Sequence, residues 1–124
     1  MYPRCELMTS VFTGRTAARP EPYTSRVVGE SDTVVAEVST GDGAVVSSAR
    51  LARWGRYGII DQVETVPGFR HRGLATAVMA TLGNWAVSHG VRTGLLSATD
   101  DGAVLYRRLG WTASGEIADA VRSH

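Results

Sequence analysis

The stretch Val66-Pro67-Gly68-Phe69-Arg70-His71-Arg72-Gly73-Leu74-Ala75 decides how this chain is interpreted. It joins a strand-like run, residues 57–66, to a helix-like run, residues 73–89. Backbone N–H groups at a helix start are unpaired and carry partial positive charge. Glycine lets an anion approach the main chain, and arginine adds a cation that binds phosphate in a bidentate way. We therefore predict a diphosphate-binding loop at this junction.

The segments after the loop predict a helix, a strand and a second helix. Apolar residues at helical spacing indicate that 73–89 is an amphipathic helix facing a sheet: Leu74, Val78, Leu82 and Trp85. Gly90 ends that helix, a short buried strand follows around Leu95, and Asp101 opens the next helix. Strand, helix and strand in succession form a parallel crossover, so we expect a mixed sheet.

These pieces together resemble a known family. Arg70-x-x-Gly73-x-Ala75, after a strand ending in Val-Pro, resembles the acyl-CoA loop of the GCN5-related N-acetyltransferases (GNAT). The similarity covers about residues 57–116, where the helix, the short strand, a helix bearing Tyr106 and the pair Gly110-Trp111 follow in the family's order. It implies an α+β fold with a mixed sheet. An antiparallel N-terminal meander would lead into a β-α-β-α-β half.

The first half of the chain predicts that meander directly. Runs rich in Val and Thr indicate strands at 26–30, 33–39, 44–54 and 57–66, with Gly41-Asp42-Gly43 as a tight turn. Residues 1–20 show no clear period, so we expect a loosely ordered N-terminal arm followed by a single domain over 21–124.

One departure from the family concerns the acceptor side. Family members usually have two helices between their first and second strands, and these build one wall of the acceptor site. Between Glu30 and Thr33 there is room only for a turn. The wall of the acceptor site would then be formed by the N-terminal arm or by a second subunit, or it would be absent. A homodimer, a fragment of a longer chain and several acceptor classes all stay open.

Composition narrows the function classes. A length of 124 residues suits one domain, and a net charge of +1 gives no nucleic-acid footprint. No apolar run approaches the ~18 residues of a membrane span, and no signal peptide is evident. The single cysteine, Cys5, fits a reducing cytoplasm. His71, His89 and His124 are scattered, so we expect no metal site.

The resemblance assigns roles to individual residues. Main-chain amides of 68–75 would hold the pyrophosphate of acetyl-CoA, with Arg70 and Arg72 beside it. Main-chain groups of 63–65 would pair with the pantetheine arm and polarise the acetyl carbonyl. The expected cofactor-binding set is Val63, Glu64, Thr65, Gly68, Phe69, Arg70, His71, Arg72, Gly73, Leu74, Ala75, Thr99, Ala103 and Tyr106.

The implied activity is transfer of an acetyl group from acetyl-CoA to a primary amine, which attacks the thioester directly. The acceptor would be a small amine, an amino acid or a protein amine. Tyr106 would assist departure of the thiolate. A phenol has a pKa of about 10 and a thiol about 8.5, so a hydrogen bond that strengthens as charge builds on sulfur describes this role better than full proton transfer.

The general base is the least determined role. Asp61, Glu64 and Asp100 are candidates, and Glu64 is preferred. Asp61 and Glu64 have opposite parity on one strand, so they would point to opposite faces unless a bulge intervenes. Two other classes stay open: a protein that binds acyl-CoA without turnover, and an interaction module that assembles through an exposed sheet edge.

Overall fold

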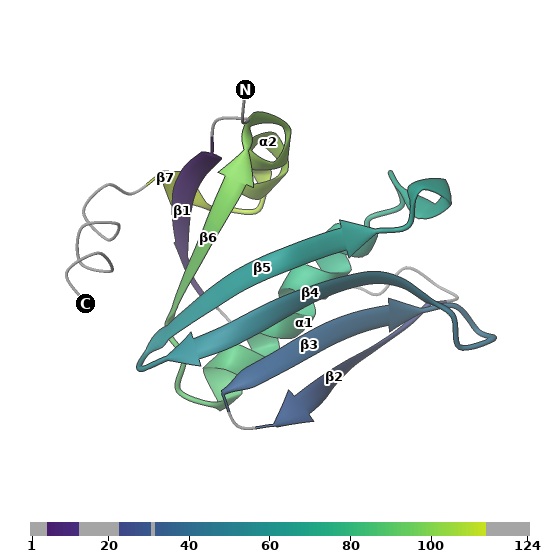
Figure 1. Cartoon of the computed structure of the whole chain (residues 1–124), viewed down its shortest axis with the longest axis horizontal. Helices are drawn as coiled ribbons and strands as arrows, with labels where there is room; N and C mark the ends of the chain where they lie inside the picture. The colour runs from purple at the N-terminus through teal and green to yellow at the C-terminus, as the bar shows by residue number, and fades with distance from the viewer. Residues whose placement is uncertain (1–4, 13–22, 31, 114–124) are drawn as a thin grey trace.

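The computed structural model describes residues 5–12, 23–30 and 32–113, which build a seven-stranded sheet in the order β2-β3-β4-β5-β6-β1-β7. Helix α1 packs on one face of strands β2 to β5, and α2 packs against β6 and β1 (Figure 1). The elements are β1 (Cys5–Val11), β2 (Thr24–Glu30), β3 (Thr33–Ser39), β4 (Val45–Trp54), β5 (Tyr57–Thr65), the 3₁₀ turn η1 (Pro67–Phe69), α1 (Leu74–Ser88), β6 (Thr93–Thr99), α2 (Asp100–Arg108) and β7 (Thr112–Ala113).

Strands β2 to β5 form the antiparallel meander that the sequence predicts. Alternation in β3 explains why: Val34, Ala36 and Val38 are buried and belong to the main core. The residues between them belong to the other face, where two ion pairs cross neighbouring strands, Arg26 with Glu37 and Arg50 with Asp61. Apolar side chains thus face α1, and the opposite face of the meander carries charge.

The N-terminal segment differs from the expectation. The predicted loose arm over 1–20 is wrong for Cys5–Val11, which is strand β1. It lies between β6 and β7 and is antiparallel to both, with Met8 fully buried. A strand whose partner lies about 90 residues further along has no local turn signal to reveal it. Phe12 is the only other described residue of the predicted arm, because residues 1–4 and 13–20 lie outside the described ranges.

This strand also changes the interpretation of the acceptor side. The turn between Glu30 and Thr33 joins the second and third strands of the chain, not the first and second. The segment between the first two strands runs through residues 13–22, which lie outside the described ranges. The short turn is therefore no measure of how the acceptor wall is built.

Helix α1 closes the core. Its inner face includes Leu74, Val78 and Leu82, as the periodicity predicts, and Trp85 is half-buried with its ring stacked on His89 at 4.2 Å between centroids. Gly90, at φ +74°, follows the helix end. Neither α1 nor α2, the helices of the described ranges, has the length and apolar character needed to cross a bilayer.

Strands β5 and β6 pair only at one end. Their parallel ladder runs from Tyr57 opposite Thr93 to Ile60 opposite Leu96, and beyond it the two strands diverge (Figure 1). The register of β5 against β4 shifts at the same place, and Gln62 has a left-handed φ of +52°. This bulge, with the divergence beside it, opens the sheet where the loop begins.

Candidate active site

The loop after β5 turns the chain so that the start of α1 is left open. Phe69 donates its N–H to the Val66 carbonyl at 2.8 Å, which closes η1. His71 and Gly73 then have left-handed φ values of +65° and +76°. The first backbone bond of the helix runs from the Ala77 N–H to the Gly73 carbonyl at 3.1 Å, and Gly73 provides no side-chain cap. The amides of residues 74–76, which precede the first backbone bond of the helix, are therefore available to an anion.

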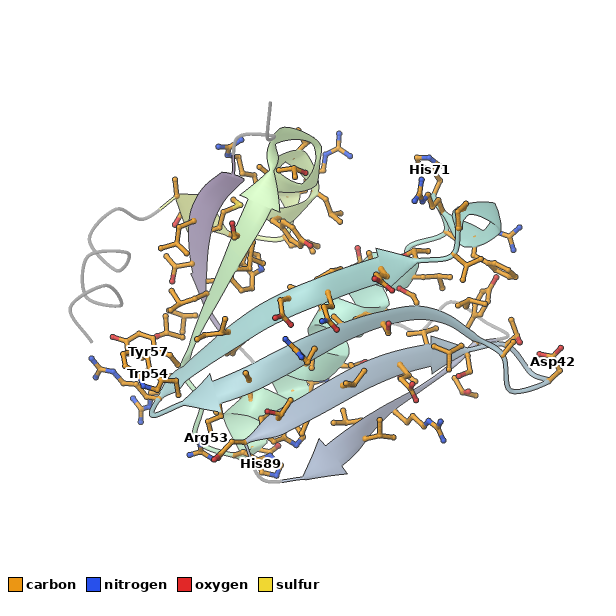
Figure 2. The ribbon with its side chains drawn as sticks, viewed as in Figure 1. Asp42, Arg53, Trp54, Tyr57, His71 and His89 are labelled. Atoms are coloured by element: carbon orange, nitrogen blue, oxygen red, sulfur yellow. The ribbon has the colours of Figure 1, made fainter. Side chains whose placement is uncertain are left out.

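A cavity of about 1240 Å³ adjoins this loop. The start of β4, the end of β5, the start of α1 and one side of α2 line it. Its arginine and histidine side chains, Arg70, His71 and Arg108, are exposed, and His71 lies at the outer end of the loop, remote from Trp54 and Tyr57 (Figure 2). Ten of the residues predicted to bind the cofactor line it: Val63, Glu64, Thr65, Phe69, Arg70, His71, Gly73, Leu74, Ala75 and Tyr106.

Four predicted residues do not line this cavity. Gly68 is exposed, and Ala103 is buried in the core. The Thr99 hydroxyl accepts a hydrogen bond from the Gly102 N–H at 3.4 Å, so Thr99 is the N-cap of α2. Arg72 is exposed and turns toward the start of β2. The binding role of all fourteen residues stays a prediction.

Arg72 belongs to a small cluster that holds the loop. It donates a hydrogen bond from Nη1 to the Tyr23 hydroxyl at 2.9 Å, and its guanidinium lies 5.1 Å from the centre of the Phe69 ring. Tyr23 also meets Phe69 edge to face at 6.4 Å. The cluster ties η1 to the residue before β2. Arg72 thus fixes the loop through contacts that the sequence did not indicate.

Two residues near the cavity were missed by sequence reasoning. Ser47 is buried on β4, and its hydroxyl donates to the Glu64 carbonyl and contacts the Thr65 hydroxyl, both at 3.0 Å. It fixes the end of β5 beside the bulge. Arg108, the last residue of α2, adds a cation opposite the loop. Only the strand register and the helix orientation bring these side chains here, and no local motif marks them.

A second cavity of about 510 Å³ lies between β5 and β6. Both cavities share four residues, Val63, Glu64, Gly102 and Tyr106. The remaining lining of the second cavity comes from β1, β5 and β6: Leu7, Ile59, Ile60, Asp61, Gln62, Leu95, Leu96, Ser97, Ala98 and Thr99. The two hollows therefore meet where the strands diverge.

Tyr106 lies in the wall common to both cavities. Its side chain is almost buried and meets the Trp111 ring at 6.3 Å, with an interplanar angle of 62°. Burial raises the pKa of the phenol, because desolvation penalises the phenolate. The hydroxyl therefore stays protonated at neutral pH and is able to donate a hydrogen bond.

The bulge answers the parity question for the carboxylates. Asp61 is opposite Arg50 and Glu64 is opposite Ser48, so two residues, Gln62 and Val63, face Ala49. Ser48 and Arg50 share a face because they are two apart, and their partners share it too. Asp61 and Glu64 both line the second cavity. The side chain of Asp100, the third base candidate, lies outside the described residues.

The two carboxylates differ in their partners. Arg50 donates to both Asp61 oxygens, from Nε at 2.8 Å and from Nη2 at 2.6 Å. The Glu64 side chain is exposed, and its carboxylate has no ion-pair or hydrogen-bond partner within the described ranges. Nor do those ranges contain a group of three or more side chains arranged to hold a metal ion. Glu64 is thus the carboxylate available to a ligand.

A mixed sheet that divides beside an anion-suited loop, with a buried tyrosine at the division, defines a protein of the acyl-CoA N-acyltransferase fold. The acetyltransferase (GNAT) family model matches residues 6–111, and the chain belongs to this family. The match begins within β1, so the family domain includes the segment that was expected to be an arm.

Solved structures show the same fold. A GCN5-related N-acetyltransferase from Kribbella flavida is 19% identical with a TM-score of 0.72, and covers 94% of this chain and 60% of its own. A GCN5-related N-acetyltransferase from Sphaerobacter thermophilus is 18% identical with a TM-score of 0.75, over 89% of this chain and 48% of its own.

A tandem GNAT protein from the clavulanic acid biosynthesis pathway is 10% identical with a TM-score of 0.75, over 90% of this chain and half of its own. No curated protein matches the sequence. The chain thus spans about half to three fifths of the length of these solved relatives.

Proposed function

We propose that this chain transfers an acetyl group from acetyl-CoA to a primary amine, with donor and acceptor bound together. The observation that carries the proposal is the meeting of two cavities at Glu64 and Tyr106. One cavity suits a long anion, because it combines unpaired helix-start amides with two arginine side chains, Arg70 and Arg108. The other leads to the same wall from β5 and β6. Direct transfer between two ligands needs this arrangement.

The residues present fit acetyl-CoA. The larger cavity, at about 1240 Å³, exceeds the ~300–1,000 Å³ of ordinary small-molecule sites and accommodates a long ligand. Arg70 and Arg108 supply local positive charge that the whole chain, at +1, lacks. The edge of β5 beyond Ile60 has lost its pairing with β6, so main-chain groups there are free to pair with an extended ligand.

The chemistry divides between Glu64 and Tyr106. Bound acetyl-CoA supplies an acetyl group as a thioester. Glu64 attracts the acceptor ammonium, takes a proton from its nitrogen and, being exposed, passes that proton to solvent. The freed nitrogen forms the new N–C bond as the C–S bond breaks. The Tyr106 hydroxyl donates a hydrogen bond to the leaving sulfur as negative charge builds on it. The nitrogen loses a second proton when the amide forms, and this proton ends on the sulfur to give the free thiol.

Calorimetric titration with acetyl-CoA tests the donor site. The unaltered chain should bind with a micromolar dissociation constant, and Arg70→Glu should weaken binding about tenfold or more, because hydrogen bonds to charged groups contribute about 1.5–3 kcal/mol. Arg92→Glu makes the same charge change at an exposed arginine away from the cavity and should bind almost normally. Equal affinity of all three proteins would contradict the placement of the anion.

Release of thiol in an amine screen tests turnover. Tyr106→Phe should lower turnover about 10- to 100-fold while the affinity for acetyl-CoA stays within about twofold, because the phenol contributes as charge develops on sulfur. Binding without turnover in the unaltered chain would favour the acyl-CoA-binding alternative.

Because the pKa of Tyr106 is raised, the proposed function predicts how stability and turnover depend on pH. The phenol favours its neutral form in the folded chain, and an unfolded tyrosine ionises near pH 10. The resulting stabilisation is fully present below about pH 10 and disappears as pH rises through the folded pKa. Turnover should therefore keep its Tyr106-dependent component up to pH 10. A homodimer and a cytoplasmic location stay predictions.

A further inference from the structure

We infer that the acceptor is a cationic amine with an aliphatic side chain and with no carboxylate beside the amine, bound in the cavity between β5 and β6. This inference rests on the proposed function, because it identifies the ligand of the second cavity of the same site. Three observations carry it: the sign of the charge in each cavity, the pairing of the carboxylates and the apolar floor.

The two cavities carry opposite charge. The described residues around the larger one include Arg70, His71 and Arg108 and a single carboxylate, Glu64. Those around the smaller one include Asp61 and Glu64 and no arginine, lysine or histidine. Because charge complementarity governs which ligand enters a hollow, the larger cavity suits an anion and the smaller one a cation.

The partners of the carboxylates place the cation. Arg50 occupies both oxygens of Asp61, so this carboxylate is already neutralised by a bidentate pair. Glu64 has no such partner among the described residues and stands in the wall that both cavities share. An ammonium at Glu64 therefore lies at the junction. A carboxylate on the same ligand, lying in the smaller cavity, would face Glu64 with no arginine, lysine or histidine among the described lining residues of that cavity to compensate.

The floor of the smaller cavity selects an aliphatic group. Ile59 on β5 pairs with Leu95 on β6, and Leu7 on β1 approaches from the next strand. Leu95 is only 2% exposed but does not belong to the main core, which lies on the α1 side. With a volume of about 510 Å³, the cavity is of small-molecule size. Amines with an aliphatic side chain, such as that of leucine, fit these conditions.

Leucinamide and leucine test the inference, because they share the side chain and differ in the carboxylate. Binding to the chain is followed by backbone-amide NMR shifts, with and without coenzyme A. We expect leucinamide to shift residues 59–64 and 95–97, with a dissociation constant at least fivefold below that of leucine. Glu64→Gln should remove this difference, whereas Asp32→Asn, which removes an exposed carboxylate outside both cavities, should preserve it.

The outcomes separate this inference from the proposed function. Failure of acetyl-CoA to bind in calorimetry would overturn the proposed function itself. Normal acetyl-CoA binding with leucine equal to or better than leucinamide would overturn only the acceptor class. Shifts that fall away from β5 and β6, or no shifts with either ligand, would overturn the assignment of the smaller cavity to the acceptor. Selective leucinamide shifts that depend on Glu64 support the inference.

Discussion

Strand β5 has two halves with opposite surroundings. Residues 57–60 are bonded to β4 on one side and β6 on the other, and Gly58 and Ile60 are buried. Residues 61–65 are bonded to β4 alone, and their side chains are half-buried or exposed. The first half contributes Ile60 to the core and Ile59 to the floor of the smaller cavity, whereas the second half lines both cavities. Burial is therefore concentrated in the first half of the strand and ligand-accessible surface in the second, with the change where the pairing with β6 stops.

We call residues 57–60 the closed half of β5 and residues 61–65 the open half. Truncation of a side chain in the closed half should have the largest effect on stability. Ile60 is 2% exposed, so Ile60→Ala should lower the free energy of unfolding by about 2–5 kcal/mol through lost burial and the cavity left behind. Val63→Ala in the open half is the control, and it should cost less than about 1.5 kcal/mol because Val63 is only half-buried. Urea denaturation measures both. Similar losses would mean that the two halves contribute equally to the core.

The bulge between the halves should make stability sensitive to the residue at position 62, because that residue must adopt a left-handed backbone conformation. Gln62 has a φ of +52°, which a β-branched side chain adopts with strain, so Gln62→Val should lower stability by about 1–3 kcal/mol. Gln62→Gly should stay within about 0.5 kcal/mol, since glycine accepts this φ but gains freedom when unfolded. Thermal unfolding compares the two. A neutral Gln62→Val result would show that the bulge moves to another residue.

Contacts that position the loop after the open half should have a smaller effect, and it should appear as a change in the affinity for acetyl-CoA. Tyr23→Phe removes the hydroxyl that accepts from Arg72, so the affinity for acetyl-CoA should fall about fivefold, equivalent to about 1 kcal/mol. Tyr57→Phe, the same change in the closed half, should leave the affinity unaltered. Calorimetric titration gives both values. If the two variants bound alike, the Tyr23 contact would not position the loop.

The closed half and the helices could be predicted from the sequence because their signals are local. Valine alternation and the turn at 41–43 define the meander, and helical spacing over 73–89 agrees with α1 at Leu74–Ser88. The open half could be predicted only in outline. Whether Asp61 and Glu64 share a face depends on the bulge, and the positions of Ser47 and Arg108 depend on strand register and helix orientation. Such features arise from long-range packing that no short window contains.

The position of β1 has a consequence for synthesis of the protein. A ribosome releases Cys5–Val11 early, yet the partners of this strand, Thr93–Thr99 and Thr112–Ala113, emerge about 90 residues later. Contacts this distant in sequence form slowly, and unpaired strands attract other chains in the meantime. The meander and α1 can associate while β1 is still without a partner. We therefore expect the pairing of β1 with β6 and β7 to come late in folding, and the interval before it to be when the nascent protein is most exposed to aggregation.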